Sequence, residues 1–220
     1  MYNKNPKNPV MNHSYDKEEG DYYIFIKKEL DKIHISPRDH HFQSFPIKYY
    51  IGQMTPKREK LIRFAISDFE EFFPMKEIKI KDQADLKIEI ASFDEIKKRY
   101  PDIPEEGLSG VGGLERVQTS IKYLPFIRPG KPTRSIVLLT PHAFDQPLIS
   151  KAIIMHELGH AFGLADHSDD PYDLMYKNTM TKSEIDSNKI IVNGIEQDLE
   201  EANSLSIRDL NTLWVLYNQW

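Results

Sequence analysis

The hydrophobic and polar positions divide the chain into a polar start and a longer, regularly patterned part. About the first 20 residues are polar, with Asn, Lys and Pro prominent, and an apolar, β-prone run follows at 22–26. Regular spacing of apolar residues begins near Phe45. We therefore expect residues 1–44 to form an N-terminal tail or a pro-segment, and residues 45–220 to form one folded domain.

The patterned part predicts strands and helices in mixed order. Alternating apolar residues are typical of half-buried strands, a continuous apolar run is typical of a fully buried strand, and apolar spacings of three and four residues are typical of helices. The sequence predicts strands at 47–51, 78–80, 86–90, 117–124 and 136–139, and helices at 56–73, 147–162 and 206–217. The Pro- and Gly-rich stretch 101–113 predicts a long loop or an irregular edge strand.

The composition narrows the classes of function. The 220 residues include no cysteine, which excludes disulfide scaffolds, thiolate zinc sites, iron–sulfur clusters and cysteine nucleophiles. The net charge of −5 is not that of a nucleic-acid binder, and no apolar run approaches the roughly 18 residues of a membrane span. We expect a monomer without nucleic-acid or membrane partners. Because residues 1–10 lack the apolar run of a signal peptide, the protein is either cytoplasmic or secreted with a signal outside this sequence.

One motif carries chemistry. His156 and His160 are four residues apart on a predicted helix, so their imidazoles project from one face and can bind one zinc ion. Glu157 lies beside them, where its carboxylate can reach a water on that zinc and take its proton. A third ligand must come from another segment. Gly163, three residues after His160, is placed where the chain must turn sharply to bring that ligand back.

The segment HELGHAFGLADH at 156–167, followed by DLMY at 173–176, resembles the signature of the metzincin metallopeptidases and, among them, the matrixins. The order of predicted elements extends this resemblance over residues 45–220. It implies an α+β zincin fold, in which a twisted mixed sheet packs on two long helices above a small C-terminal subdomain with the final helix. Met175 would be the methionine of the Met-turn. The implied activity is a zinc-dependent endopeptidase, in which Glu157 activates a zinc-bound water against a protein or peptide substrate.

The third ligand departs from the family pattern. The usual third histidine comes three residues after the glycine, and this chain has Asp166 there, as the snapalysin group does, with His167 next. Counting back from Met175 instead selects His167, which makes Ala165 a one-residue insertion. We favour His167, because imidazole is the commoner ligand and a carboxylate would weaken zinc as a Lewis acid. Asp166 is the alternative, and the residue that is not the ligand would orient one.

Two further features suggest secondary sites. The stretch from Leu164 onward is acidic, and Asp169, Asp170 and Asp173 could hold a calcium ion, although their spacing matches no EF-hand loop. The glycines between 107 and 113 would let a substrate strand approach the edge of the sheet closely.

Two other functions compete with the peptidase hypothesis. The protein could be a zinc-binding regulatory or interaction module that has lost catalysis, although the intact Glu157 argues against this. It could also be an HExxH peptidase outside the metzincins, with a glutamate ligand downstream such as Glu184 or Glu196. Gly163 and Met175 argue against that second alternative.

Overall fold

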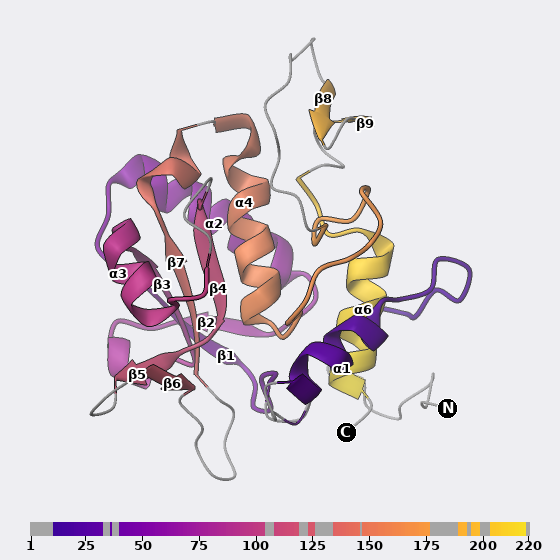
Figure 1. The fold of residues 1–220 in the computed structure, drawn as a ribbon, viewed down its shortest axis with the longest axis horizontal. Coiled ribbons are helices and arrows are strands. Elements are labelled where there is room, and N and C mark those ends of the chain that lie inside the picture. The colour runs from indigo at the N-terminus through magenta and orange to yellow at the C-terminus, as the bar shows by residue number, and fades with distance from the viewer. Residues whose placement is uncertain are drawn as a thin grey trace.

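The computed structural model describes most of the chain and shows a mixed α/β fold (Figure 1). The described residues are 11–32, 36, 40–103, 108–118, 123–125, 134–145, 147–176, 189–192, 195–198 and 203–218. The helices are α1 (Tyr23–Lys32), α2 (Pro56–Glu70), η2 (Lys81–Gln83), α3 (Phe93–Arg99), η3 (Pro141–Phe144), α4 (Pro147–Ala161) and α6 (Ile207–Asn218). The strands are β1 (Ile47–Ile51), β2 (Met75–Glu77), β3 (Leu86–Ile90), β4 (Gly110–Leu114), β5 (Arg116–Gln118), β6 (Tyr123–Pro125), β7 (Ser135–Leu139), β8 (Lys189–Val192) and β9 (Ile195–Asp198).

Five of the strands form one mostly parallel sheet in the order β2-β1-β3-β7-β4. All neighbours in it are parallel except β4, which runs antiparallel to β7 at one edge. The predicted strands at 47–51, 86–90 and 136–139 are confirmed. The predicted strand at 117–124 is instead two short strands, β5 and β6, which pair with each other. This architecture agrees with the α+β expectation at the level of a mixed sheet packed with helices.

The predicted strand at 78–80 is wrong, because the edge strand β2 lies a few residues earlier, at 75–77. Just after β2, the Ile78 N–H donates to the Tyr49 carbonyl of β1 at 2.9 Å. Ile80 is 55% exposed and precedes the short helix η2. Ile78 and Ile80 therefore alternate although neither belongs to a strand.

The continuous apolar run of β7 is explained by helices on both of its faces. Val137 and Leu139 belong to the larger core, which also contains the buried residues of α2 and α4. Ile136 and Leu138 belong to a smaller core with Ile96 of α3. Because β7 is buried on both sides, alternation is absent from its sequence, as is typical of central parallel strands.

An aromatic cluster joins the sheet-covering helices to the C-terminal helix. The ring of Phe162, just after α4, lies 4.5 Å from that of Phe69 in α2 and 5.0 Å from that of Phe73. The ring of Tyr217 in α6 lies 4.7 Å from that of Phe73, and its hydroxyl donates to the Phe162 carbonyl at 2.9 Å. Each fully buried Phe contributes about 1.5–3 kcal/mol by leaving water. The cluster fixes where α4 ends, next to the predicted metal ligands.

The N-terminal segment 11–32 differs from the loose tail that its composition predicted. Met11, Tyr22, Ile26 and Leu30 are all buried in the larger core, and α1 lies across α6 (Figure 1). Residues 23–26 are helical rather than extended, because spacings of three and four residues place the buried side chains of Tyr23, Ile26 and Leu30 on one face of α1, and Tyr22 precedes the helix. The described residues of this segment are thus part of the folded unit.

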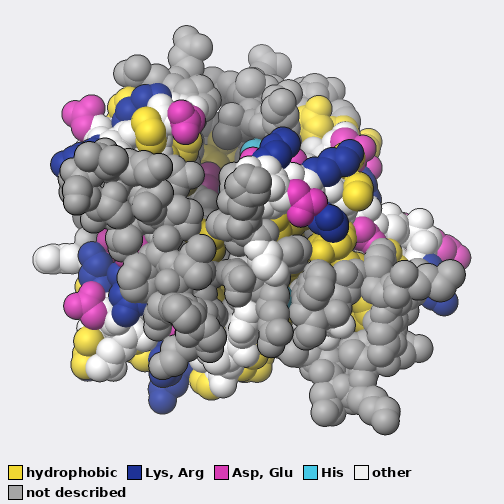
Figure 2. All heavy atoms as spheres, turned by 60° about the horizontal axis from the view of Figure 1, so that its bottom comes forward, with side chains coloured by type: hydrophobic (Ala, Val, Ile, Leu, Met, Phe, Trp, Pro, Cys, Tyr) yellow, Lys and Arg dark blue, Asp and Glu magenta, His cyan; other side chains and the backbone are white. Residues whose placement is uncertain are grey.

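The described surface carries mixed charge. Figure 2 shows described Lys and Arg side chains beside Asp and Glu side chains on one face of the molecule. Among the described residues, Arg63 forms ion pairs with Glu59 and Glu77, each at 2.8 Å. Within the described ranges, the helices are too short or too polar to cross a bilayer.

Candidate metal centre

Helix α4 presents His156 and His160 from adjacent turns, with their rings 4.9 Å apart. The Nδ1 of His156 lies 2.8 Å from the carbonyl oxygen of Leu174, and the Nδ1 of His160 lies 2.5 Å from that of Leu164. A carbonyl oxygen can only accept, so Nδ1 carries the proton in both rings. With Nδ1 protonated, the neutral form of each ring has its lone pair on Nε2, which is the tautomer that a metal ligand requires.

His167 brings a third imidazole to the same place. Its ring lies 5.2 Å from that of His156 and 4.9 Å from that of His160. One ligand atom from each of the three histidines lies within 4.8 Å of the other two, close enough to bind a metal ion. Burial and the neighbouring histidines hold the pKa of His160 well below its ordinary value, so this ring is neutral at pH 7 and able to donate to a metal.

Asp166, the alternative third ligand, is not a member of this group of three. Its Oδ1 accepts the N–H of His167 at 2.8 Å and lies 3.8 Å from the Nδ1 of the same residue. The carboxylate is therefore a neighbour of His167 in this arrangement.

Gly163 forms the turn that returns the chain from α4 toward His167. Its φ is +116°, a left-handed value that favours glycine. Its N–H donates to the His160 carbonyl at 3.1 Å, which closes the end of the helix. A Cβ at this position would also overlap the side chain of Leu216 in α6. Position 163 therefore requires glycine for both conformation and space.

Met175 lies against α4 between the two histidines of the helix. It is fully buried, and a Cβ at Gly159 would lie only 2.5 Å from its sulfur. The Met175 carbonyl accepts the N–H of Ser168 at 2.8 Å, so the segment that carries His167 is paired with the segment that carries Met175. Met175, the methionine predicted to support the site, thus contacts α4 in the turn between His156 and His160.

Glu157 is buried beside His156 and faces the edge strand β4. A Cβ at Gly110 would lie 2.9 Å from its Cγ, and a Cβ at Gly112 would overlap its backbone. Burial raises the pKa of Glu157, while the charge of His156 and a hydrogen bond from the Gly112 N–H act in the opposite direction. A raised pKa makes this carboxylate a stronger base than an exposed glutamate.

The glycines of β4 therefore have a role that the sequence did not indicate. Gly110 and Gly112 face α4 and let the helix approach the strand closely at Glu157. The close approach of a substrate, which the sequence suggested for these glycines, stays a prediction. Gly107 lies outside the described residues.

The outer edge of β4 presents main-chain groups away from the sheet. At one end of β4 the Thr140 N–H donates to the Ser109 carbonyl, and at the other end the Glu115 N–H donates to the Arg134 carbonyl; Arg134 and Thr140 flank β7. By the alternation of an antiparallel ladder, Gly110, Gly112 and Leu114 direct their N–H and C=O groups away from β7. The bond from the Gly112 N–H to Glu157 agrees with this direction.

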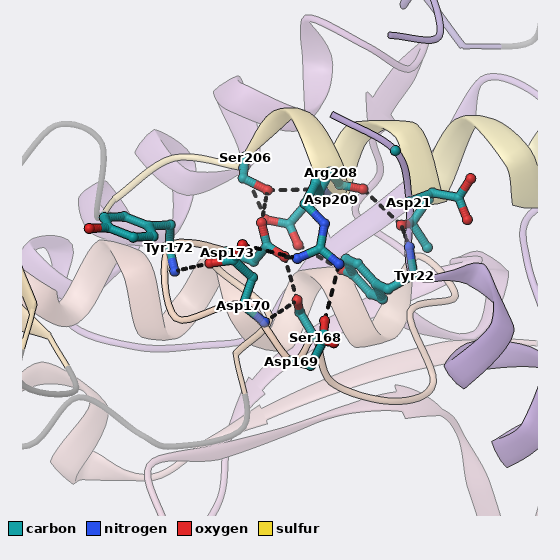
Figure 3. A network of polar contacts seen from close by, with 12 residues as sticks. Asp21, Tyr22, Ser168, Asp169, Asp170, Tyr172, Asp173, Ser206, Arg208 and Asp209 are labelled. Atoms are coloured by element: carbon teal, nitrogen blue, oxygen red, sulfur yellow. Dashed lines mark hydrogen bonds and ion pairs between the residues drawn. The ribbon is translucent and has the colours of Figure 1, made fainter. Parts of the chain in front are cut away.

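The acidic residues suggested for calcium converge instead on a guanidinium (Figure 3). Arg208 forms ion pairs with Asp169 at 3.1 Å, with Asp170 at 3.3 Å and with Asp173 at 3.0 Å. The hydroxyls of Ser168 and Ser206 also donate hydrogen bonds to the Asp173 carboxylate. A positive charge of the protein itself thus occupies the place that the calcium hypothesis gave to a metal ion.

Asp209 is a functional candidate that sequence reasoning missed. It is fully buried, and its Oδ2 accepts the N–H groups of Leu174 at 3.0 Å and Ser206 at 2.9 Å. Burial and the charge of Asp173 raise its pKa to about 6, although hydrogen bonds from Tyr22 and Ser206 act in the opposite direction. A signal was present, because Ser206 and Asp209 have the spacing of a capping box, and the Asp209 N–H donates to the Ser206 hydroxyl at 3.0 Å.

The chain at 40–41 packs beneath the Gly163 turn. A Cβ at Gly163 would lie 3.2 Å from the His40 carbonyl oxygen. His40 is buried, and neither of its ring nitrogens has a hydrogen-bond partner among the described residues. Burial and the neighbouring His41 lower the pKa of His40 to about 4, so the ring is neutral at pH 7.

Of the two alternative glutamate ligands, Glu184 lies outside the described residues, and only the backbone of Glu196 is described. Comparison of the chain with protein-family models and with curated proteins found no match.

Proposed function

We propose that this protein is a zinc-dependent endopeptidase with a metzincin-type catalytic domain. The observation that carries the proposal is the convergence of His156, His160 and His167 with Glu157 buried beside the first of them. The Gly163 turn and the packing of Met175 on α4 support it.

The donor set fits zinc. Three neutral imidazoles are a common ligand set for catalytic zinc, and they leave a fourth position for water or substrate. In this assignment His156 and His160 would bind through Nε2, because their Nδ1 atoms donate to main-chain carbonyls. When bound, zinc lowers the pKa of a coordinated water and polarises the substrate carbonyl. We assign His167 as the third ligand, with Asp166 orienting its segment.

Glu157 is the general base and acid of this proposal. Its carboxylate takes a proton from the attacking water and transfers it to the nitrogen of the departing amine. Burial favours the protonated form of the side chain, which the transfer requires, and the Gly112 N–H holds the carboxylate in place. The position of that N–H at the edge of β4 links the proton-transfer group to the strand along which a substrate would lie.

An extended peptide could pair with the outer edge of β4. The outward N–H and C=O of Gly110 and the outward C=O of Gly112 can form the main-chain hydrogen bonds of an added strand. Such pairing recognises the peptide backbone and would place a peptide bond near Glu157. The proposed substrates are therefore proteins or peptides in an extended conformation.

Metal removal and replacement tests this function. The purified full-length chain is stripped with a chelator, and its cleavage of a mixed peptide library is measured before and after adding back one equivalent of zinc. We expect the stripped protein to be inactive and one zinc per chain to restore cleavage. A chain that binds zinc with this stoichiometry and cleaves nothing would support the competing hypothesis of a binding module.

A further inference from the structure

A line of hydrogen bonds connects the N-terminal segment to the candidate metal centre. The hydroxyl of Tyr22 donates to Oδ1 of Asp209 at 2.6 Å, and Figure 3 shows the tyrosine reaching this carboxylate from beside α6. Oδ2 of Asp209 accepts the N–H of Leu174 at 3.0 Å. The carbonyl of Leu174 in turn accepts the Nδ1 proton of His156 at 2.8 Å. Residue 174 is thus held on both sides, by Asp209 and by His156.

This line lies inside the protein, where its geometry is protected from water. Tyr22 is 1% exposed and Asp209 is fully buried. The N–H of Tyr22 also donates to the Thr212 hydroxyl at 3.0 Å, and the Arg208 guanidinium lies 5.8 Å from its ring. A buried carboxylate oxygen that loses its hydrogen-bond donor is destabilised, so Asp209 and its neighbours would shift if the tyrosine hydroxyl were removed.

We propose that Tyr22 is a positioning residue for the metal centre, acting on His156 through Asp209 and Leu174. The inference rests on the proposed function, since it assigns His156 as a metal ligand. It makes the N-terminal segment a permanent part of the catalytic unit, in contrast to a pro-segment whose removal would activate the enzyme. Mutation of a residue that orients a metal-binding histidine typically lowers metal affinity by about 10–100-fold.

The variant Tyr22→Phe tests this role in the full-length chain, because it removes the hydroxyl and keeps the ring. Zinc affinity is measured by competition with a chromophoric chelator, and the visible spectrum of the cobalt(II)-substituted protein reports ligand geometry. We expect zinc affinity to fall about tenfold and the cobalt spectrum to change. Zinc affinity within twofold of the original chain, with an unchanged spectrum, would overturn the proposal.

Tyr15→Phe is the matched control. The Tyr15 hydroxyl also donates to a carboxylate at 2.6 Å, that of Asp21, within the same segment. Its ring also packs on α6, 5.4 Å from that of Trp214. The Tyr15 hydroxyl donates to Asp21 and not to Asp209, so we expect zinc affinity within twofold of the original chain. An equal loss in both tyrosine variants would show a merely structural effect of the segment and would contradict the proposal.

A second variant keeps the test decisive if Tyr22→Phe does not fold. Asp209→Asn retains one oxygen for the Leu174 N–H and loses the charge, and it too is expected to lower zinc affinity about tenfold. Unchanged affinity in this variant would overturn the proposal. A chain that binds zinc and cleaves no peptide would contradict the proposed function while leaving the affinity test of Tyr22 intact. A chain that binds no zinc would contradict both.

Discussion

The sulfur of Met175 packs against Gly159, in the turn of helix α4 that separates His156 from His160. A Cβ at position 159 would lie 2.5 Å from this sulfur, closer than atoms can approach without movement. The methionine therefore fills the space that glycine leaves on the helix. This contact ties the segment after His167 to the helix that carries the other two grouped histidines.

The variant Gly159→Ala should disturb this contact. The added methyl group must displace Met175 from a fully buried position, and such overpacking costs about 1–3 kcal/mol. We expect the free energy of unfolding of the metal-free protein to fall by that amount in urea titrations, with weaker zinc binding. Gly52→Ala is the control, because a Cβ there meets its neighbours at 3.4 Å or more. Equal effects of the two substitutions would contradict the assigned contact.

The third metal ligand can be tested by comparing two neighbouring substitutions. We expect His167→Ala to lose most zinc binding and all peptide cleavage, because it removes one of the three grouped imidazoles. Asp166→Ala should retain one zinc per chain with affinity lowered about tenfold, because its carboxylate accepts the N–H of His167 and lies near that ring without joining the three grouped imidazoles. Metal content after dialysis measures both. The reverse ranking would make Asp166 the ligand.

Asp209 should make stability depend on pH between about 4 and 6. Burial, followed by the charge of Asp173, raises the folded-state pKa of Asp209 to about 6 from an ordinary value of 3.8. The folded protein therefore binds this proton more tightly than the unfolded chain, so the contribution to stability is full below pH 3.8 and is lost as pH rises through about 6. The full difference is about 3 kcal/mol at 1.36 kcal/mol for each pKa unit.

Urea unfolding of the metal-free protein at several pH values measures this effect. The difference in unfolding free energy between the original chain and Asp209→Asn should change by a few kcal/mol across this pH window and level off above it. A difference that stays constant from pH 4 to pH 7 would contradict the raised pKa.

Calcium should have little effect on the folded protein. The three carboxylates suggested for this ion already pair with Arg208, and the guanidinium is only 20% exposed. We expect millimolar calcium to leave the melting temperature of the zinc-loaded protein unchanged, whereas Arg208→Met should lower it, because the buried Asp173 loses the positive charge beside it. A rise of several degrees on adding calcium to the original chain would contradict the assignment.

The sequence predicted the parts of the site that depend on local geometry. Two histidines four apart on a helix must share a face, and Gly163 gives a turn whose position is set by the helix end. The choice between Asp166 and His167 could not be made in this way, because it depends on the pairing of Ser168 with Met175 across a loop. Spacing along the chain does not contain that pairing.

The N-terminal segment illustrates the other limit of sequence reasoning. The run at 22–26 favours a strand by composition, yet residues 23–26 belong to α1, because packing in the larger core with α6 favours a helix with one apolar face. The role of Tyr22 depends on a carboxylate 187 residues later in the chain. The capping-box spacing of Ser206 and Asp209 is a local pattern that could have pointed to the Asp209 carboxylate. No local pattern points to its partner Tyr22.

In the proposed function, Glu157 moves protons during peptide hydrolysis at a zinc site. The most direct measurement compares the original chain with Glu157→Gln, which keeps the size of the side chain and removes the base, by zinc content and by peptide-library cleavage. Glu71→Gln, at an exposed position after α2, is the control. We predict one zinc per chain in all three proteins and cleavage lowered about 10²–10⁴-fold only in Glu157→Gln. Undiminished cleavage by zinc-loaded Glu157→Gln would contradict the claim.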